Sequence, residues 1–296
     1  MNLRTLLLCV ACAWSLAPAS AADVEAIGKL FGNLKGLSGK VSPEEERAFG
    51  REASATLLGA EPALADPAAQ RYVNRIGLWV ALQSERPDLA WRFAVLDDPD
   101  VNAFAAPGGY VFVTKGLLEL LDSEAELAGV LSHEVTHVVR KHHLNALTKD
   151  KRMSALTGLA SDKIGGDDPR KREMAAKVLT GVKTLYARGL DKADEYQADR
   201  EGVVIAARAG YDAGGLVGVV QKLDALDPGA AGVLLLFKTH PLPADRLALL
   251  DDVFSTGALD ALSGVEGRER YRSALRSILA PPAPVVAPTG KPKPKR

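Results

Sequence analysis

The chain has 296 residues, of which 47% are hydrophobic and 25% charged, so it can bury one substantial core. Its 37 basic and 37 acidic residues balance, which leaves no electrostatic case for nucleic-acid binding. We therefore expect a single domain with short extensions.

The N-terminus has the pattern of a cleaved signal peptide. Arg4 precedes an apolar run from Leu6 to Trp14 and a stretch of small residues, which predicts a signal peptide over residues 1–22 and export to the periplasm. The apolar run is too short for a bilayer, which needs about 20 apolar residues. Cys9 and Cys12 both lie inside it, so the mature chain is expected to have no disulfide and no thiol catalysis. The alternatives are a lipoprotein anchored through Cys12 and a buried N-terminal helix.

No other run approaches transmembrane length, so we expect a soluble periplasmic protein. An N-terminal extension over residues 23–42 leads to a domain over residues 43–280. Ser42-Pro43 with Glu45 forms a helix start with a capping box, and Asp66-Pro67 begins a helix that runs to about Ser84. Three strands are predicted next, at residues 91–96, around Phe104 and around Val111. From Leu117 onward the pattern is almost entirely helical, which predicts an α+β domain.

The most informative segment is His133-Glu134-Val135-Thr136-His137, an HExxH motif. At about 100° per residue, His133 and His137 lie some 40° apart around a helix, so both rings can reach one ion. Glu134 flanks them within reach of a water in an open coordination position. The helix also carries an apolar stripe, which makes a merely solvated or core-lining role for the charged triplet a poor explanation.

A catalytic zinc site needs a third protein ligand, and two candidates compete. His143 lies where some zincins carry a third His, but those proteins have Gly three residues after the second His, and this chain has Arg140. The segment after His137 is predicted to continue as helix, which leaves His142 and His143 pointing away as solvated residues. The other candidate is Glu195, which shares a helix face with Asp199. One of these carboxylates can bind the metal while the other fixes the tautomer of a ligating His.

Small residues surround Glu195 and Asp199 in the sequence. Ala198, Gly202 and Ala206 would let their helix pack tightly against the HExxH helix.

Two further segments lie outside the predicted core. Residues 150–169 form either a mobile lid or a plain surface connection. Residues 281–296 form a disordered Pro- and Lys-rich tail, which is solvated or touches anionic surfaces.

At this point the chain resembles the gluzincin metallopeptidases of the CAAX prenyl endopeptidase, HtpX and BepA–LoiP type, and is most similar to the soluble periplasmic members. The HExxH motif is followed by Glu-Tyr-Gln-Ala-Asp at residues 195–199. Asn102–Leu118 is similar to the strand-and-turn element of that family, and Thr239-His240-Pro241 with Arg246 is similar to its late His-Pro segment. The resemblance runs from about residue 43 to residue 253, with the four motifs in the order of the family. It implies a zincin-like fold with a small sheet beside the HExxH helix.

The resemblance also implies roles for individual residues, with one zinc ion as cofactor. The ion would be held by His133, His137 and Glu195, and Glu134 would be the general base. Asp199 would orient a ligating His from behind, and Arg246 would be a structural partner of the acidic cluster. His240 would lie near the open face of the zinc, either stabilising the oxyanion or acting as a self-inhibitory gate; the alternative is an ordinary loop His before Pro241.

The strand after Gly108-Gly109 has a predicted role of its own. Tyr110, Val111 and Phe112 alternate as a strand, and in zincins an exposed edge strand beside the metal pairs with an extended peptide substrate. These residues are therefore candidates for substrate binding. The alternative is an interior strand with no role in binding.

Two functions from different classes follow. The favoured one is a zinc endopeptidase that cleaves misfolded or misassembled cell-envelope proteins, with unfolded or extended proteins, outer-membrane proteins among them, as substrates and with peripheral membrane association. The rival is a chaperone-like envelope assembly factor in which the zinc site is gated or structural. A metal-binding protein without turnover is the third possibility, and the presence of Glu134 argues against it.

Overall fold

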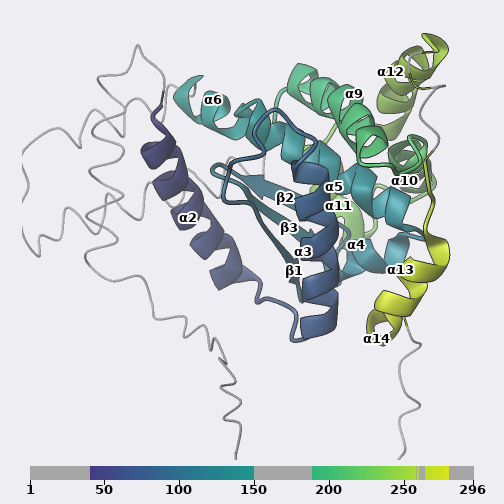
Figure 1. Ribbon diagram of the computed structural model, residues 1–296, viewed down its shortest axis with the longest axis horizontal. Coiled ribbons are helices and arrows are strands. Elements are labelled where there is room, and N and C mark those ends of the chain that lie inside the picture. The colour runs from purple at the N-terminus through teal and green to yellow at the C-terminus, as the bar shows by residue number, and fades with distance from the viewer. Residues whose placement is uncertain (1–40, 150–188, 258, 260–263, 280–296) are drawn as a thin grey trace, which may run out of the picture.

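The computed structural model describes residues 41–149, 189–257, 259 and 264–279 (Figure 1). The predicted signal peptide, most of the N-terminal extension, the 150–169 segment and the C-terminal tail lie outside the described residues. None of the described helices is both long enough and apolar enough to cross a membrane.

The described chain is mostly helical with one small sheet, as expected for an α+β domain (Figure 1). Its elements are α2 (Pro43–Ala60), α3 (Pro67–Ala81), β1 (Arg92–Leu96), β2 (Ala103–Ala106), β3 (Tyr110–Thr114), α4 (Lys115–Leu120), α5 (Glu124–Val139), α6 (His142–Lys149), α9 (Lys192–Arg208), α10 (Gly215–Asp224), a 3₁₀ turn (Ala231–Val233), α11 (Leu234–Thr239), α12 (Pro243–Ser255), α13 (Arg268–Ala274) and α14 (Arg276–Leu279). The cap of α3 is the predicted one, because the Asp66 carboxylate accepts hydrogen bonds from the backbone N–H groups of Ala68 and Ala69 at 2.9 and 3.1 Å.

The sheet has the strand order β1-β3-β2, with β1 parallel and β2 antiparallel to β3. The expectation that Tyr110, Val111 and Phe112 form an edge strand is therefore wrong. They belong to the central strand, whose backbone hydrogen bonds are used by β1 on one side and β2 on the other. A peptide cannot add to a strand that is already paired on both sides.

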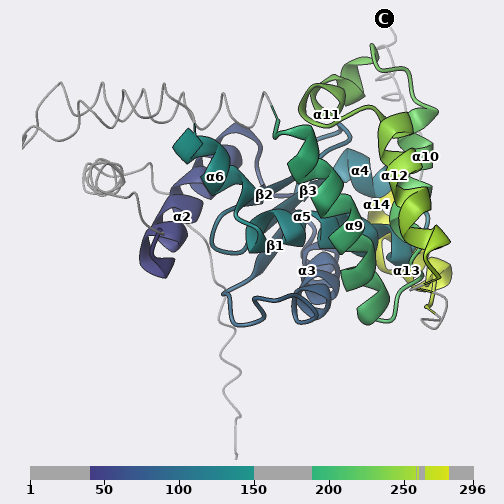
Figure 2. The ribbon, with the colours of Figure 1, turned by 90° about the horizontal axis from the view of Figure 1, so that it is seen from above.

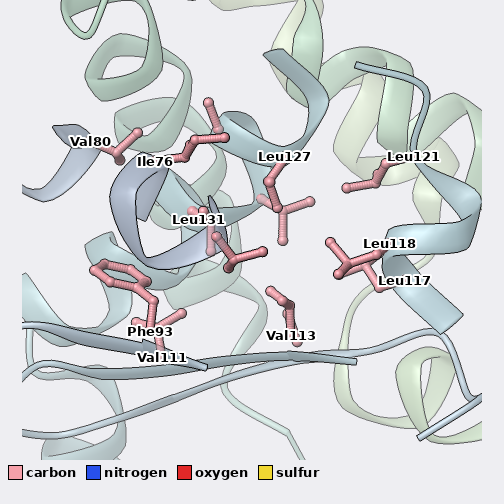
Figure 3. Packing of buried hydrophobic residues seen from close by; sticks show 14 of the residues in the cluster. Ile76, Val80, Phe93, Val111, Val113, Leu117, Leu118, Leu121, Leu127 and Leu131 are labelled. Atoms are coloured by element: carbon pink, nitrogen blue, oxygen red, sulfur yellow. The ribbon is translucent and has the colours of Figure 1, made fainter. Parts of the chain in front are cut away.

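Helices cover the sheet on both sides (Figure 1). α3 packs on β1 and α5 on β2, whereas α2 lies beside β2 and β3 on the side away from α3 and α5. Figure 3 shows the side chains of this core: Val113 of β3 points toward Leu127 and Leu131 of α5, and Val111 lies beside Phe93 of β1. The core sheet thus serves as a platform for the HExxH helix.

Helix α5 is the central element, and all of its residues are buried. Its first turn is capped by Ser123, whose hydroxyl accepts a hydrogen bond from the Glu126 N–H at 3.1 Å. The prediction that this helix runs on through Lys141 is wrong. It ends at Val139, Lys141 adopts a left-handed conformation with φ 59°, and α6 begins at His142. This turn brings His142 back into the protein.

Helix α9 lies directly against α5 (Figure 2). The predicted small residues make this approach possible: a Cβ atom at Gly202 would lie 3.0 Å from the backbone N and 3.1 Å from the Cα of His133. Ala198 and Ala206 are also buried along the same face of α9. The distance between the two helices is therefore set at the level of the first HExxH histidine.

We expect Gly202→Ala to lower the free energy of unfolding by about 1–3 kcal/mol, because two helix backbones must separate by a few tenths of an ångström. Gly59→Ala is the matched control, since nothing lies within 4 Å of a Cβ at that position in α2. That control should gain roughly 0.5–1 kcal/mol from helix propensity. Urea denaturation of both variants measures the difference, and equal stabilities would contradict the close packing of α5 and α9.

A buried carboxylate anchors the turn after α5 to the N-terminal helix. Glu46 is 1% exposed and accepts hydrogen bonds from Arg86 at 2.7 and 3.0 Å. Lys141 Nζ lies 2.9 Å from the same carboxylate. Arg86 also donates to the Val138 carbonyl at 3.2 Å, near the end of α5. Burial acts to raise the pKa of Glu46, but the two cations outweigh it and hold this pKa below its ordinary value of 4.5.

This pairing predicts acid sensitivity. A carboxylate whose pKa is lowered by folding stabilises the protein above its unfolded-state pKa, and that stabilisation is lost as the pH falls through the folded-state value. We expect Glu46→Gln to lose about 2 kcal/mol of stability at pH 7 and to approach the stability of the wild type in acid, near pH 3. Urea denaturation at the two pH values measures this. A difference that persisted unchanged at pH 3 would contradict the ionic origin of the effect.

Candidate metal centre

Three donor groups from two separate segments converge at the middle of the molecule. His133 Nε2 and His137 Nε2, one turn apart on α5, lie 3.0 Å from each other. Glu195 on α9 places Oε2 3.6 Å from the His133 nitrogen and Oε1 3.6 Å from the His137 nitrogen. All three side chains are 2–3% exposed. The tight packing of α9 on α5 is what brings the carboxylate to the two rings.

This arrangement fits a four-coordinate metal ion. In a tetrahedral site with ligand bonds of about 2.0–2.2 Å, neighbouring donor atoms are separated by about 3.3–3.6 Å. The observed separations of 3.0–3.6 Å bracket that range. In addition, Glu195 Oε2 is buried without a hydrogen-bond partner, which is costly unless a cation binds it. The three donors therefore form a group able to hold a metal.

Behind His133 lies an ion pair that fixes the orientation of its ring. His133 Nδ1 lies 2.9 Å from Asp199 Oδ1, and Arg246 binds the same carboxylate through two hydrogen bonds of 2.8 and 2.6 Å. Burial opposes ionisation of Asp199, but Arg246 and His133 hold its pKa below the ordinary value. An ionised Asp199 accepts a hydrogen bond from Nδ1–H, so the lone pair of His133 Nε2 faces the donor group. Asp199 and Arg246 thus lie together behind the His133 ring.

The protonation of the donors follows from their surroundings. Burial lowers the pKa of His133, but Asp199 and Glu195 outweigh it and raise that pKa to about 9. Burial lowers the pKa of His137 well below 6.5. The pKa of Glu195 is lowered despite burial, because His240, His137 and His133 surround it. Without a bound ion, a proton on His133 neutralises the Glu195 carboxylate, so a cation that binds these three donors must displace that proton.

Glu134 lies beside these three donors and lines two small cavities. It is 3% exposed, and burial, with Glu195, raises its pKa to about 7 although His133 acts to lower it. The carboxylate lines a cavity of about 40 Å³ that is also bounded by His133, His240 and Asn102, and a second cavity of about 30 Å³. Cavities of this size have room for water. A carboxylate with a pKa near neutrality next to a water-sized space can accept and return a proton.

His240 lies on the same side of the group. Its Nε2 is 3.6 Å from Glu195 Oε2, and its ring centre is 5.9 Å from that of His133. The other ring nitrogen, Nδ1, lies 2.9 Å from the Thr239 hydroxyl and 3.3 Å from the Leu236 carbonyl, which hold the ring in place. With His133 and Glu134 it forms a second group of possible metal ligands. His240 is therefore not an ordinary exposed loop residue.

Two predictions about neighbouring residues need correction. His142 is not solvated: it is 2% exposed, and its Nδ1 lies 2.9 Å from His137 Nδ1. His143 is only partly exposed, and its ring centre is 5.6 Å from that of His137. Neither belongs to the group formed by His133, His137 and Glu195. The sequence carries no sign of the turn that buries His142, because Lys141 adopts a conformation normally associated with Gly or Asn.

The strand beside the site is also different from the predicted one. None of Tyr110, Val111 and Phe112 lines either cavity at Glu134. The part of the sheet that lines these cavities is instead β2 and the residue before it, with Asn102, Ala103, Phe104 and Ala105. β2 is one of the two edge strands of the described sheet, and it packs against α5.

Comparison with known proteins places the chain in a family. The model of peptidase family M48 matches residues 67–253. The beta-barrel assembly-enhancing protease of Escherichia coli (strain K12) is 30% identical over 198 residues, covering 65% of this chain and 40% of the relative. The protein of the same name from Yersinia pestis is 28% identical over 213 residues, covering 70% and 43%. The mitochondrial metalloendopeptidase OMA1 of Schizosaccharomyces pombe is 28% identical over 182 residues, covering 61% and 52%.

The chain spans about half or less of the length of these relatives. The family match, however, covers more than half of this chain and contains both the HExxH helix and Glu195. The relatives that align with it carry names of proteases and metalloendopeptidases. The chain belongs to peptidase family M48, as the resemblance of its motifs to the gluzincin metallopeptidases predicted.

Proposed function

We propose that the chain is a zinc-dependent endopeptidase with a zincin-like fold that acts on misfolded or misassembled proteins of the cell envelope. One observation carries the proposal: His133, His137 and Glu195, from two helices, meet with donor separations of 3.0–3.6 Å, and Glu134 lies beside them. Two imidazoles and one carboxylate are the ligand set of a catalytic zinc of the His₂Glu type. A structural zinc site would need no adjacent base.

The side chains around the site divide the work of hydrolysis. His133, His137 and Glu195 would hold a zinc ion, which would supply Lewis-acid activation of a water and of the peptide carbonyl. Glu134 takes a proton from the attacking water and returns it to the leaving amine. Asp199, held by Arg246, keeps the His133 ring in the tautomer that presents its lone pair to the ion.

Extended polypeptides are the proposed substrates. The relatives named beta-barrel assembly-enhancing protease point to outer-membrane proteins among them, and the predicted signal peptide points to the periplasm. The two cavities of about 40 and 30 Å³ that Glu134 lines in the described part of the chain have room for water but are too small for a peptide.

His240 is the proposed gate or oxyanion ligand, because its Nε2 points at the donor group from the side of the cavities. We expect His240→Ala to change the rate of peptide hydrolysis by at least about tenfold, given the size of single polar contributions at such sites. A faster variant indicates a gate, and a slower one indicates a role in the transition state. Bound zinc should stay stoichiometric, as measured by elemental analysis, since three ligands remain; unchanged kinetics would remove His240 from the site.

The proposed function is tested on the purified chain. Bound zinc is measured by elemental analysis, and cleavage of casein and of an unfolded outer-membrane protein is followed with and without a chelator. We expect one zinc per chain, loss of cleavage on chelation and recovery when zinc is restored. A chain with stoichiometric zinc that cleaves no unfolded protein, even as the His240→Ala variant, would favour the assembly factor. A chain that binds no zinc would overturn the proposal altogether.

A further inference from the structure

His142 makes a contact that the reaction described above does not use. Its Nδ1 lies 2.9 Å from His137 Nδ1, and the two rings meet edge to face at a centroid distance of 5.0 Å. Two imidazole nitrogens at this distance must share one proton, because one has to donate and the other accept. The direction of that hydrogen bond decides which nitrogen of His137 is free to bind a metal.

The direction of the hydrogen bond between His142 and His137 follows from a chain of polar groups that begins at Glu201. Glu201 is a carboxylate and can only accept, and it receives hydrogen bonds from Arg140 Nε at 2.6 Å and from Gln197 Nε2 at 2.8 Å. The amide nitrogen of Gln197 therefore faces Glu201, and its Oε1 faces His142 Nε2 at 3.3 Å. Since Oε1 is an acceptor, and the Asp194 carboxylate also lies 3.7 Å from this nitrogen, His142 Nε2 carries the proton.

The tautomer of His142 determines the tautomer of His137. A neutral imidazole with its proton on Nε2 has a lone pair on Nδ1, so His142 accepts from His137 Nδ1–H. The lone pair of His137 Nε2 is then directed at His133 and Glu195. His133 reaches the same state through Asp199 and Arg246, but there the acceptor is a charged carboxylate.

We propose that His142 is a positioning residue for His137, and that Arg140, Glu201, Gln197 and His142 form a directed hydrogen-bond chain that sets the tautomer of this ligand. The inference rests on the proposed zinc site. It adds a set of residues whose role lies in binding the ion rather than in the transfer of protons to the substrate. The neutral acceptor makes His137 a weaker electron donor to the ion than His133, which faces a carboxylate.

Metal affinity is the first test, measured on the full chain by competition with a chromophoric chelator. His142→Phe keeps a ring but has no acceptor, and we expect the zinc dissociation constant to rise about 10- to 100-fold. His142→Asn places an amide oxygen close to the position of Nδ1, so it should restore most of the affinity. Gln197→Leu should weaken zinc binding less than His142→Phe, and Gln221→Leu, at an exposed position of α10, is the matched control without effect.

The tautomer is the second test, because a purely structural role would not move it. The chain has five histidines, so their ring ¹⁵N resonances can be assigned with single variants in the zinc-bound protein. We expect the proton of His142 on Nε2 in the wild type, and a mixture of tautomers in Gln197→Leu. A proton on Nδ1 of His142, or equal zinc affinities of wild type, His142→Phe and His142→Asn, would overturn the inference. A wild-type chain that binds no zinc would instead overturn the proposed function.

Discussion

Glu134→Gln is expected to retain zinc and lose at least about 10³-fold in peptide hydrolysis, within the usual contribution of a general base. The amide has nearly the same shape as the carboxylate but cannot accept the proton of a water. Glu134 is not one of the three converging donors, and its carboxylate instead lines the water-sized cavities beside them. Its replacement should therefore leave the affinity for zinc unchanged.

The pH dependence of the wild-type activity is a second test of Glu134 as the general base. The pKa of Glu134 is raised to about 7, first by burial. A bound cation nearby favours the ionised carboxylate and lowers this pKa, so the acidic limb of kcat/KM should fall below pH 7. The activity should decline as the pH drops through the pKa of Glu134 in the metal-bound protein, because the base becomes protonated. A limb that persisted unchanged in residual Glu134→Gln activity would contradict the assignment, as would a variant that cleaves casein at the rate of the wild type.

The parts of the site that follow from local geometry could be predicted from the sequence. The spacing of His133 and His137 places them on one helix face whatever the rest of the fold does. The small residues Ala198 and Gly202 indicated that α9 could approach α5 closely, and Gly202 does lie against the His133 backbone. These features depend on a few residues and on regular helix geometry.

The parts that depend on long-range pairing could not be predicted in this way. Whether β3 is an edge strand is decided by which strands flank it, and the alternation of Tyr110–Val113 is the same in either position. The end of α5 depends on the left-handed conformation of Lys141, which Glu46 holds from a helix almost 100 residues earlier in the chain. Because no pattern in the sequence predicts that turn, none predicts the contact of His142 with His137 either.

Glu195→Ala is expected to abolish both zinc binding and hydrolysis, and it is the sharper test of the site as a whole. Zinc affinity should fall by more than the roughly 100-fold that outer residues around a metal contribute, because a ligand itself is lost. Removing the carboxylate also leaves His133, held by Asp199, and His137 without the anion that lies between them. The two imidazoles alone would hold a divalent cation far more weakly than the three donors together.

The measurement is the melting temperature with and without added zinc, alongside elemental analysis. A ligand present at 1,000 times its dissociation constant stabilises the folded state by about 4.1 kcal/mol, so zinc should raise the melting temperature of the wild type clearly. Glu195→Ala should show no such shift, whereas Arg200→Ala, on the exposed face of α9, should behave like the wild type. If Glu195→Ala kept stoichiometric zinc and full activity, the third ligand would have to be another residue, and the hydrolase proposed here would lose its central observation.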